Sequence, residues 1–334
     1  MNSIGNPLPA PAVSIPHIVA PKEVPAVQVA IVTHDRHARA YRTRALLDRL
    51  TARGVRWVLL SPDRTILEMR QGTLRFLDGA GRVVTPDVVL NALYLASGYG
   101  LEVIEGFEAA GIPVVNSAAG WRKAKTKALA SVAFCVHGVA HPETVCSLGV
   151  PPALGAVAHA TLGPPLVYKP WRGTMGAGVT LLTRPRSVYV AMARLARRGA
   201  PVYLQRFVPN PGRDIRVMVV GGEAIGATYR LARRGRWKTN ITAGGIPAPC
   251  PVTPELAAIA LAATASVGLD IAGVDVIEGP QGYQILEINA WPNYERFDQV
   301  AGVDVADRIA QLLIARAQKA AADQAEAEVA AADG

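Results

Sequence analysis

The sequence predicts a mixed α/β protein that is built from several subdomains. Strand-like apolar runs alternate with helical patterns over residues 27–118, which is typical of a parallel α/β unit. Residues 273–293 read as a β-hairpin, with two apolar runs on either side of the turn residues Gly279, Pro280, Gln281 and Gly282. A chain of 334 residues is long enough for two or three such subdomains, each with its own core.

The order of patterns along the chain gives the expected organisation. Residues 1–26 contain six prolines and few periodic apolar positions, and we expect a disordered leader there. An N-terminal α/β subdomain is expected over 27–118, with strands at 27–32, 55–60, 87–90 and 111–116 and helices at 38–53 and 99–110. A helix at 117–135 follows, and the Pro-, Gly- and Ala-rich stretch 142–165 contains the next boundary. Two α+β modules are expected at about 140–208 and 209–318, and residues 319–334 as a frayed or disordered tail.

Composition restricts the class of protein. Hydrophobic residues make up 50% of the chain and charged residues 18%, as in a globular protein. The longest apolar stretch, 256–269, is shorter than a bilayer span, and the N-terminus lacks a signal-peptide pattern. Cys135, Cys146 and Cys250 are widely spaced, so neither a disulfide framework nor a zinc site is expected. Together these features predict a cytoplasmic protein.

The formal net charge is +9, and part of it lies in one short segment, at Arg230, Arg233, Arg234, Arg236 and Lys238. Such a cluster suits either nucleic acid or a polyanionic small molecule. Because no RNA-binding signature accompanies it, an acidic substrate or nucleotide is the better interpretation. The six histidines (His17, His34, His37, His137, His141 and His159) fall outside the segments discussed next and are interpreted as incidental.

The predicted hairpin carries three polar side chains within otherwise buried runs, namely Asp275, Glu287 and Asn289. Glu287 and Asn289 are two residues apart and therefore point to the same face of a strand. Buried carboxylates need neutralisation. A divalent cation such as Mg²⁺ with nucleotide phosphates would supply it, and so would a Lys or Arg partner in an ordinary salt-bridged hairpin.

Two further segments suggest a phosphate site. The strand 166–170 contains Lys169 and is followed by a turn with Gly173, Gly176 and Gly178, whose backbone N–H groups can approach a phosphate closely. The order of residues is neither a P-loop nor a Rossmann fingerprint, and a plain turn is the alternative. On the strand after Gly212, Asp214 and Arg216 share one face, either as an internal ion pair or as an acid and a base facing a cleft.

Taken in order, these segments resemble the ATP-grasp superfamily, and in particular its RimK-type carboxylate–amine ligases. The resemblance covers about residues 27–316, and the block 160–300 carries its specific motifs. It implies an ATP-grasp fold, in which an N-terminal parallel α/β subdomain is followed by two α+β modules that clamp ATP.

The resemblance also implies roles for individual residues. Contacts with the nucleotide are implied for Lys127, Lys169, the glycine loop (Gly173, Thr174, Gly176, Gly178), the adenine-holding strand (Gln205, Arg206, Phe207, Val208), Asp214 near the ribose, and Lys238 and Asn240 near the γ-phosphate. Mg²⁺ ligands are implied at Asp275, Glu287 and Asn289, with two ions expected and Mn²⁺ as an alternative metal. Arg216 and Arg230 are implied to face the acyl phosphate and substrate as catalytic residues.

The implied activity is ADP-forming amide-bond synthesis through an acyl phosphate. The added amino acid is expected to be L-glutamate, and the acceptor an acidic group such as a protein or peptide C-terminus or a pterin or deazaflavin precursor. A homodimer or homotetramer is also implied. The chain departs from the family pattern at residues 290–294, which read Ala-Trp-Pro-Asn-Tyr, and this leaves the acceptor open. Two alternatives remain, namely a non-catalytic ATP-binding sensor and a basic ribosome- or nucleic-acid-associated protein.

Overall fold

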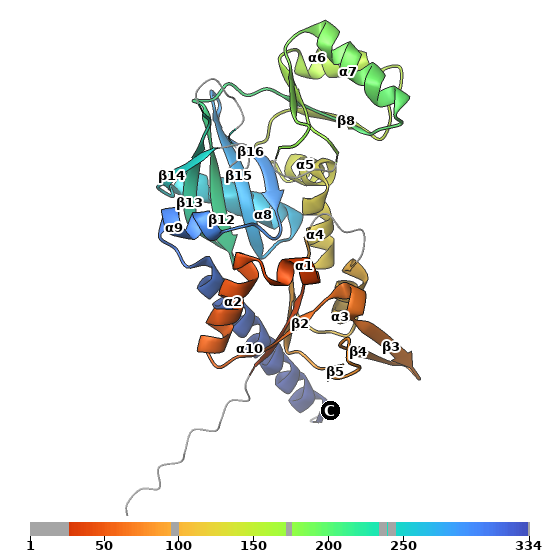
Figure 1. Cartoon of the computed structure of the whole chain (residues 1–334), viewed down its shortest axis with the longest axis vertical. Helices are drawn as coiled ribbons and strands as arrows, with labels where there is room; N and C mark the ends of the chain where they lie inside the picture. The colour runs from red at the N-terminus through yellow and green to blue at the C-terminus, as the bar shows by residue number, and fades with distance from the viewer. Residues whose placement is uncertain (1–26, 95–99, 172–175, 234–238, 240–244, 333–334) are drawn as a thin grey trace, which may run out of the picture.

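The computed structural model describes residues 27–94, 100–171, 176–233, 239 and 245–332. The N-terminal unit lies at one end of the molecule, a small helix-covered sheet lies at the other, and a larger antiparallel sheet lies between them (Figure 1). The main sheets of the three units comprise residues 28–115, 144–206 and 213–289. The mixed α/β class predicted from the sequence is therefore confirmed.

The N-terminal unit contains a four-stranded parallel sheet in the order β2-β1-β6-β7. Its elements are β1 (Gln28–Val32), α1 (Asp35–Ala38), α2 (Tyr41–Ala52), β2 (Arg56–Leu60), β6 (Val88–Asn91), α3 (Leu101–Ala109) and β7 (Val114–Val115). The alternation of apolar strands and helices predicts all of these except the short α1. It does not predict a separate antiparallel sheet formed by β3 (Ile66–Arg70), β4 (Thr73–Leu77) and β5 (Val83–Val84), because half of its side chains are exposed and these include both polar and apolar residues.

The next segment is predicted as one helix over 117–135, and the structure has two instead. α4 (Ala118–Lys125) ends at Thr126, whose backbone is extended, and α5 (Lys127–Val136) begins directly after it. The break makes Lys127 the first residue of a new helix. As a result, Lys127 does not continue the exposed face of α4 on which Lys123 lies.

The central module is a four-stranded antiparallel sheet in the order β10-β9-β11-β8, with two helices packed on it. Its elements are β8 (Thr144–Ser147), α6 (Leu154–Leu162), β9 (Leu166–Tyr168), β10 (Thr180–Leu182), α7 (Pro185–Arg197) and β11 (Val202–Arg206). β8 and α6 lie in the stretch that the sequence marks only as a boundary. Their small core of Leu and Val side chains forms with residues far along the chain, and this pairing is not readable from local composition.

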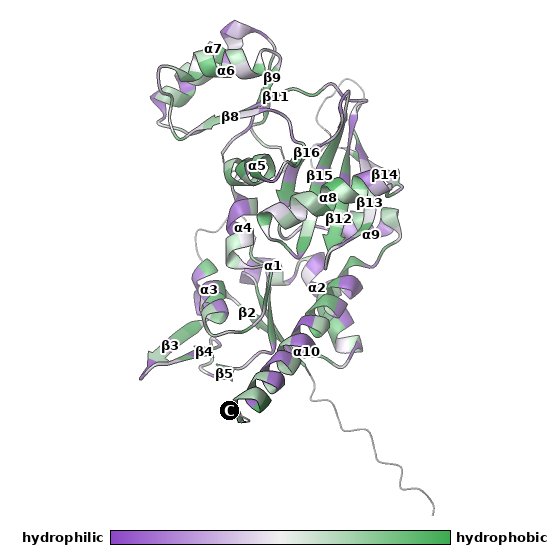
Figure 2. Cartoon of the chain, turned by 180° about the vertical axis from the view of Figure 1, so that it is seen from behind, coloured by the Kyte–Doolittle hydropathy of each residue, from purple (hydrophilic) through white to green (hydrophobic). Residues whose placement is uncertain are grey.

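The C-terminal module is a five-stranded antiparallel sheet in the order β14-β13-β12-β15-β16. Its elements are β12 (Arg213–Val220), β13 (Glu223–Leu231), β14 (Ile246–Cys250), α8 (Pro254–Val267), β15 (Ile271–Gly279), β16 (Gly282–Asn289) and α9 (Glu295–Ala301). The predicted hairpin is β15–β16, and Thr253 caps α8 by accepting a hydrogen bond from the Leu256 N–H (3.2 Å). α8 covers one face of the sheet, and the strands beneath it are hydrophobic (Figure 2).

The C-terminal helix α10 (Val305–Ala332) corrects one expectation. Residues 319–332 continue this helix, whereas the sequence predicts a frayed or disordered tail after Lys319. Alanine-rich composition supports helix even where few side chains are buried. The buried side of α10 includes Val305, Ile309 and Leu313, and it packs on α2 and β6 of the N-terminal unit (Figure 1). None of the helices in the described part of the chain is long and apolar enough to cross a membrane.

Asn116 also joins the N-terminal unit to the large sheet. Its fully buried amide donates to the carbonyls of Ile271 (2.8 Å) and Ala290 (2.7 Å), and its oxygen accepts the N–H groups of Asp270 and Ile271. One side chain thus satisfies four backbone groups at the ends of β15 and β16. The N-terminal unit is thereby fixed against the edge of the sheet from which Glu287 and Asn289 project.

Candidate active site

One face of the C-terminal sheet is apolar and packs under α8, and the other carries charge. Successive side chains of a strand point to opposite faces, and this alternation determines which residues lie on the apolar face and which on the charged face. The register then places residues of opposite charge side by side, with Asp214 opposite Arg230 and Arg216 opposite Asp275. Asp275 lies opposite Glu287, and Gly273 lies opposite Asn289. The charged face is therefore a consequence of the period-two pattern of four neighbouring strands.

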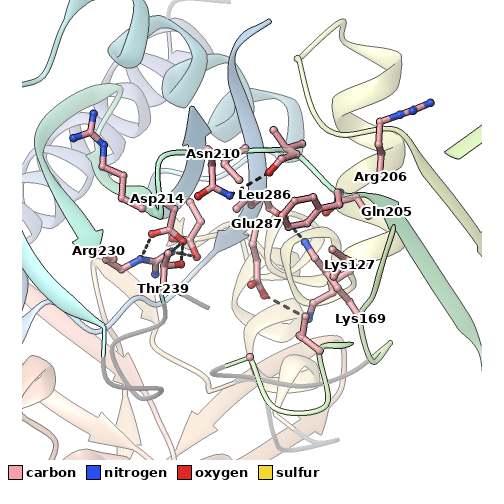
Figure 3. A pocket seen from close by; sticks show the side chains of 18 of the residues that line it. Lys127, Lys169, Gln205, Arg206, Asn210, Asp214, Arg230, Thr239, Leu286 and Glu287 are labelled. Atoms are coloured by element: carbon pink, nitrogen blue, oxygen red, sulfur yellow. Dashed lines mark hydrogen bonds and ion pairs between the residues drawn. The ribbon is translucent and has the colours of Figure 1, made fainter. Parts of the chain in front are cut away.

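Four of these side chains, Asp214, Arg216, Arg230 and Asp275, form an ion-pair network. The Arg230 guanidinium donates through Nε and Nη2 to the two carboxylate oxygens of Asp214, at 2.6 and 2.8 Å (Figure 3). Its Nη2 also lies 3.0 Å from Oδ2 of Asp275, whose Oδ1 is 2.5 Å from Nε of Arg216. Thr239 donates its hydroxyl to Asp214 (2.5 Å). Bidentate guanidinium–carboxylate contacts of this kind fix geometry as well as charge.

The network determines the ionisation of its members. Burial would raise the pKa of Asp275, but the guanidinium groups of Arg216 and Arg230 outweigh burial and hold that pKa below its ordinary value. Burial likewise acts to lower the pKa of Arg230, and the carboxylates of Asp214 and Asp275 raise it above its ordinary value. Asp275 and Arg230 are therefore both ionised at neutral pH.

Two lysines face the same sheet from the other side of the pocket (Figure 3). Lys127 Nζ lies 3.5 Å from Oε1 of Glu287, and Lys169 Nζ donates to the backbone carbonyl of Leu286 (3.4 Å). The register of β15 with β16 shifts at this point, so that Leu286 has no partner across the hairpin. Burial lowers the pKa of Lys169 to about 8, with Lys127 adding to the effect and Glu287 opposing it. An anion placed beside such a buried lysine stabilises its charged form.

The remaining walls of this first pocket come from β11 and the glycine turn. Its lining includes the predicted residues Lys127, Lys169, Gly176, Gln205, Arg206, Phe207, Val208, Asp214, Arg230, Asp275 and Glu287. The guanidinium of Arg206 points out of the pocket, where it pairs with Glu143 and donates to the Thr161 carbonyl (2.7 Å), so only the rest of that residue faces inward (Figure 3). Gly178 is not part of the lining. Its φ of +72° and a virtual Cβ 2.7 Å from Pro170 explain why glycine stands there. Gly173, Thr174, Lys238 and Asn240 lie outside the described residues.

A second pocket begins where the first ends. Arg230, Asp275 and Glu287 line both, and from them the second pocket extends over Arg216 and Asn289 toward the N-terminal unit. Its other walls are contributed mainly by α1 and α2, by the end of β6 and by the segment after β16, and include His37, Tyr41, Arg42, Leu93, Tyr94, Trp121, Trp291, Pro292 and Phe297. Trp291 and Pro292 belong to the segment 290–294, so that segment forms a wall of this pocket.

Several residues of the second pocket are not predicted from the sequence. Arg42 lies among many arginines in the first 64 residues, and no local pattern separates it from its exposed neighbours. Tyr94 and Trp121 are ordinary apolar positions of their segments. Of the six histidines that the sequence leaves aside, His37 lines this pocket. Burial and the nearby cations Arg42, Arg36 and His34 lower the pKa of His37, so its imidazole is neutral at neutral pH.

The three predicted metal ligands are brought together on one face, and their oxygens suit a hard cation such as Mg²⁺. Both oxygens of Asp275 already contact arginines, whereas the Glu287 side chain is one-third exposed and its only ion pair within the described part of the chain is with Lys127, at 3.5 Å. Among the described residues there is no cluster of three or more His, Cys, Asp or Glu side chains able to hold a metal. These three side chains therefore fit a cation that is also bound by another ligand. Glu287 is the most available of the three.

Comparison with known proteins identifies this arrangement. The model of the RimK-like ATP-grasp domain matches residues 124–313, which include the charged residues of the first pocket but not Arg42 of the second. The chain belongs to this family. It is 30% identical over 295 residues to a probable α-L-glutamate ligase of Thioalkalivibrio sulfidiphilus, covering 86% of this chain and 95% of that protein. It is 36% identical over 203 residues to a tetrahydromethanopterin:α-L-glutamate ligase of Methanococcus maripaludis, covering 59% and 68%.

Solved structures agree at the level of the fold. The ATP-grasp ligase PsnB, complexed with a minimal precursor, Mg and ADP, superposes with a TM-score of 0.68 at 21% identity, covering 87% of this chain and 98% of that one. The ATP-grasp fold predicted from the sequence motifs is therefore confirmed, and the chain is an ATP-grasp ligase.

Proposed function

We propose that this RimK-like ligase joins L-glutamate to an acidic acceptor, with ATP and Mg²⁺ in the first pocket and the acceptor in the second. The observation that carries the proposal is the junction of the two pockets at Arg230, Asp275 and Glu287. Phosphoryl transfer to a carboxylate requires both reactants to meet at one point, where the charge of the transferred group is neutralised. The relatives' names supply glutamate as the amino acid, and a pterin as one acceptor class.

The first step takes place at this junction. A carboxylate oxygen of the acceptor attacks the γ-phosphorus of ATP, and the bond from that phosphorus to the β–γ bridging oxygen breaks. The products are an acyl phosphate and ADP. Lys127 and Lys169 lie where they would offset the charge on the phosphate oxygens, and Mg²⁺ held by Glu287 with Asp275 and Asn289 would supply further positive charge.

In the second step the amine of glutamate attacks the acyl carbon. The bond from that carbon to the phosphate oxygen breaks, inorganic phosphate leaves, and the amine loses a proton to give the amide. Arg216 is the better candidate for contact with the acyl oxygen, because only its Nε is engaged, with Asp275. Arg230 uses both donors of its fork on Asp214, and we assign it a positioning role.

The structure weakens the alternative of a nucleic-acid-binding protein. The basic cluster begins at Arg230, and that side chain is buried and bound to two carboxylates. It cannot contribute to a surface for phosphates of a nucleic acid. The alternative of a non-catalytic sensor differs in its prediction for turnover, which the following experiment measures.

The test is ADP release by the purified chain with ATP, Mg²⁺ and L-glutamate, with tetrahydromethanopterin or a peptide ending in glutamate as the acceptor. Product mass should show one or more added glutamate residues. Glu287→Gln should reduce ADP release at least about 100-fold, because the most available metal ligand is lost. The matched control is Glu278→Gln on the same hairpin, which removes a pair with Arg213 instead and should keep most activity. ATP binding without turnover under all conditions would favour the sensor.

A further inference from the structure

The second pocket contains a buried cation, Arg42, that has no carboxylate partner among the described residues. Arg42 is 6% exposed, and its guanidinium carbon lies 5.3 Å from the ring centre of Tyr94 and 5.6 Å from that of Trp291. Nη1 donates to the Trp291 carbonyl (2.8 Å), and the Arg42 carbonyl accepts from the Tyr294 hydroxyl. These contacts orient the guanidinium firmly between the N-terminal unit and the segment after β16.

The two donors that form the fork of Arg42 are unused. Nε is buried without a hydrogen-bond partner, and Nη2 makes no hydrogen bond in the described part of the chain. No carboxylate of the described residues lies within 4.0 Å of the guanidinium. Asp275 and Glu287 pair with other cations, and Glu295 is exposed. The internal segments 95–99, 172–175, 234–238 and 240–244 contain no Asp or Glu that could serve instead.

Other buried nitrogen atoms without hydrogen-bond partners belong to residues of the same pocket. Trp291 is only 6% exposed, and its indole Nε1 is buried without a hydrogen-bond partner among the described residues. Nε2 of His37 also has no partner there. Both residues line the second pocket with Arg42. The buried Nε of Arg42 and the buried indole N–H of Trp291 are costly for the protein alone, because each has lost water without gaining a hydrogen bond from the described residues. An anionic group bound between them would remove that cost.

Arg230 offers a comparison, because it is a buried guanidinium with a structural role. Its Nε and Nη2 are both occupied by Asp214. Arg42 has the same fork and comparable burial, yet it faces a pocket that continues to Arg216. The difference favours a ligand as the missing partner of Arg42.

We propose that Arg42, assisted by the indole N–H of Trp291, binds a carboxylate of a substrate whose reacting end lies at Arg216. This inference rests on the proposed function, since it names the chemistry by which the same site recognises its substrate. The carboxylate is either one of L-glutamate or a second carboxylate of the acceptor. The flanking aromatic side chains Tyr94, Trp121 and Trp291 suit a planar body beside that group.

The test measures equilibrium binding to the full chain with Mg²⁺ and a non-hydrolysable ATP analogue. The ligands are L-glutamate with its two monoamides, L-glutamine and L-isoglutamine, and pteroylglutamate with its truncated form pteroate. Arg42→Gln should weaken the ligand that carries the bound carboxylate at least about tenfold, the usual size of a charged hydrogen bond. It should leave the corresponding amide or truncated ligand within about twofold of the wild-type value. Trp291→Phe, which keeps the ring and removes the N–H, should show the same selectivity with a smaller loss.

The pattern of losses identifies the source of the carboxylate. A loss confined to L-glutamate assigns Arg42 to the amino acid, and a loss confined to pteroylglutamate assigns it to the acceptor. Arg44→Gln is the matched control, because Arg44 is exposed on the same helix and should change neither affinity. Affinity for the ATP analogue reports folding. If Arg42→Gln fails to bind the analogue, Arg42→Lys, which keeps the charge but not the fork, replaces it and should lose the same ligand.

The inference is overturned if the Arg42 variants bind both acids as the wild type does, or if the wild type binds neither acid. Arg42 would then only clasp the N-terminal unit to the segment after β16. Failure of the proposed function looks different. In that case the wild type releases no ADP with any acceptor, while the dependence of acid binding on Arg42 is still observed.

Discussion

The two pockets that meet at Asp275 differ in how their charges are paired. In the first, Arg230 is held by Asp214 and Asp275, and Lys127 and Lys169 each contact an oxygen of β16. In the second, Arg42 is as deeply buried as Arg230 but has no carboxylate partner among the described residues. The first pocket therefore balances its cations with oxygen atoms of the protein. In the second pocket, the charge of Arg42 is left for a bound ligand to balance.

This difference has a physical reason. A site for polyphosphate and a divalent cation receives large charges of both signs, and internal ion pairs keep its side chains in place before they arrive. A site that must choose among acids gains selectivity if its cation is unpaired, because an amide or a shorter analogue then leaves a buried donor unsatisfied. Three predictions examine this contrast, and the largest expected effect comes first.

Arg230→Met should destabilise the folded protein by about 3–5 kcal/mol, because it leaves the buried carboxylate of Asp214 without its partner. Urea unfolding of the ligand-free chain measures the effect. The double variant Arg230→Met with Asp214→Leu should recover most of the stability, since the charge is removed together with its partner. Arg42→Gln should cost only about 1–2 kcal/mol in the same assay, for one hydrogen bond and some packing. Equal losses for Arg230→Met and Arg42→Gln would contradict the contrast between the pockets.

ATP binding should be accompanied by proton uptake near pH 8. The pKa of Lys169 is lowered to about 8 in the ligand-free protein, so about half of these side chains are neutral at that pH. Phosphate oxygens favour the charged form, and binding should therefore take up about half a proton at pH 8 and much less at pH 6.5. Titration calorimetry in buffers of different ionisation enthalpy measures the uptake. Lys169→Arg should abolish it, and an uptake that persists in this variant would assign the proton to another group.

The smallest effect is expected at Asp298, beside the second pocket. Burial raises the pKa of Asp298 to about 6, and nearby Asp304 adds to the shift, whereas hydrogen bonds from Val305 and Tyr41 oppose it. Because the folded pKa exceeds the unfolded value of about 4, the stabilising contribution is complete below pH 4 and is lost as the pH rises to about 6.

Asp298→Asn removes this dependence. Its free energy of unfolding relative to wild type should rise by about 1 kcal/mol between pH 4 and pH 7, the value being discounted because the side chain is half-exposed. Thermal unfolding across that range provides the measurement. The exposed Glu295→Gln on the same helix is the control and should show no such rise. A difference between Asp298→Asn and wild type that is independent of pH would exclude this role for burial.

Much of the fold follows from local patterns, because strand and helix periodicities are set by each segment's own residues. The alternation over 27–118 indicates the parallel sheet, and the period-two placement of Glu287 and Asn289 puts them on one face of β16. The sheet at 66–84 and the strands of the central module at 144–147 escape such patterns, since their pairing partners decide them. The alanine-rich end of α10 is misread for a similar reason, since low hydrophobicity alone does not exclude a helix.

The sequence by itself singled out the residues that we propose hold the nucleotide. Lysines, glycines and carboxylates there sit on a few strands and turns, and their order along the chain carries the family pattern. Only the tertiary structure decided that Asp275 is shared by two arginines, that Arg206 points outward, and that His37, Arg42 and Trp291 meet in one pocket. These contacts join segments about 250 residues apart, and whether a buried donor is paired depends on every segment packed around it. That Arg42 has no carboxylate partner among the described residues is therefore visible only in the folded chain.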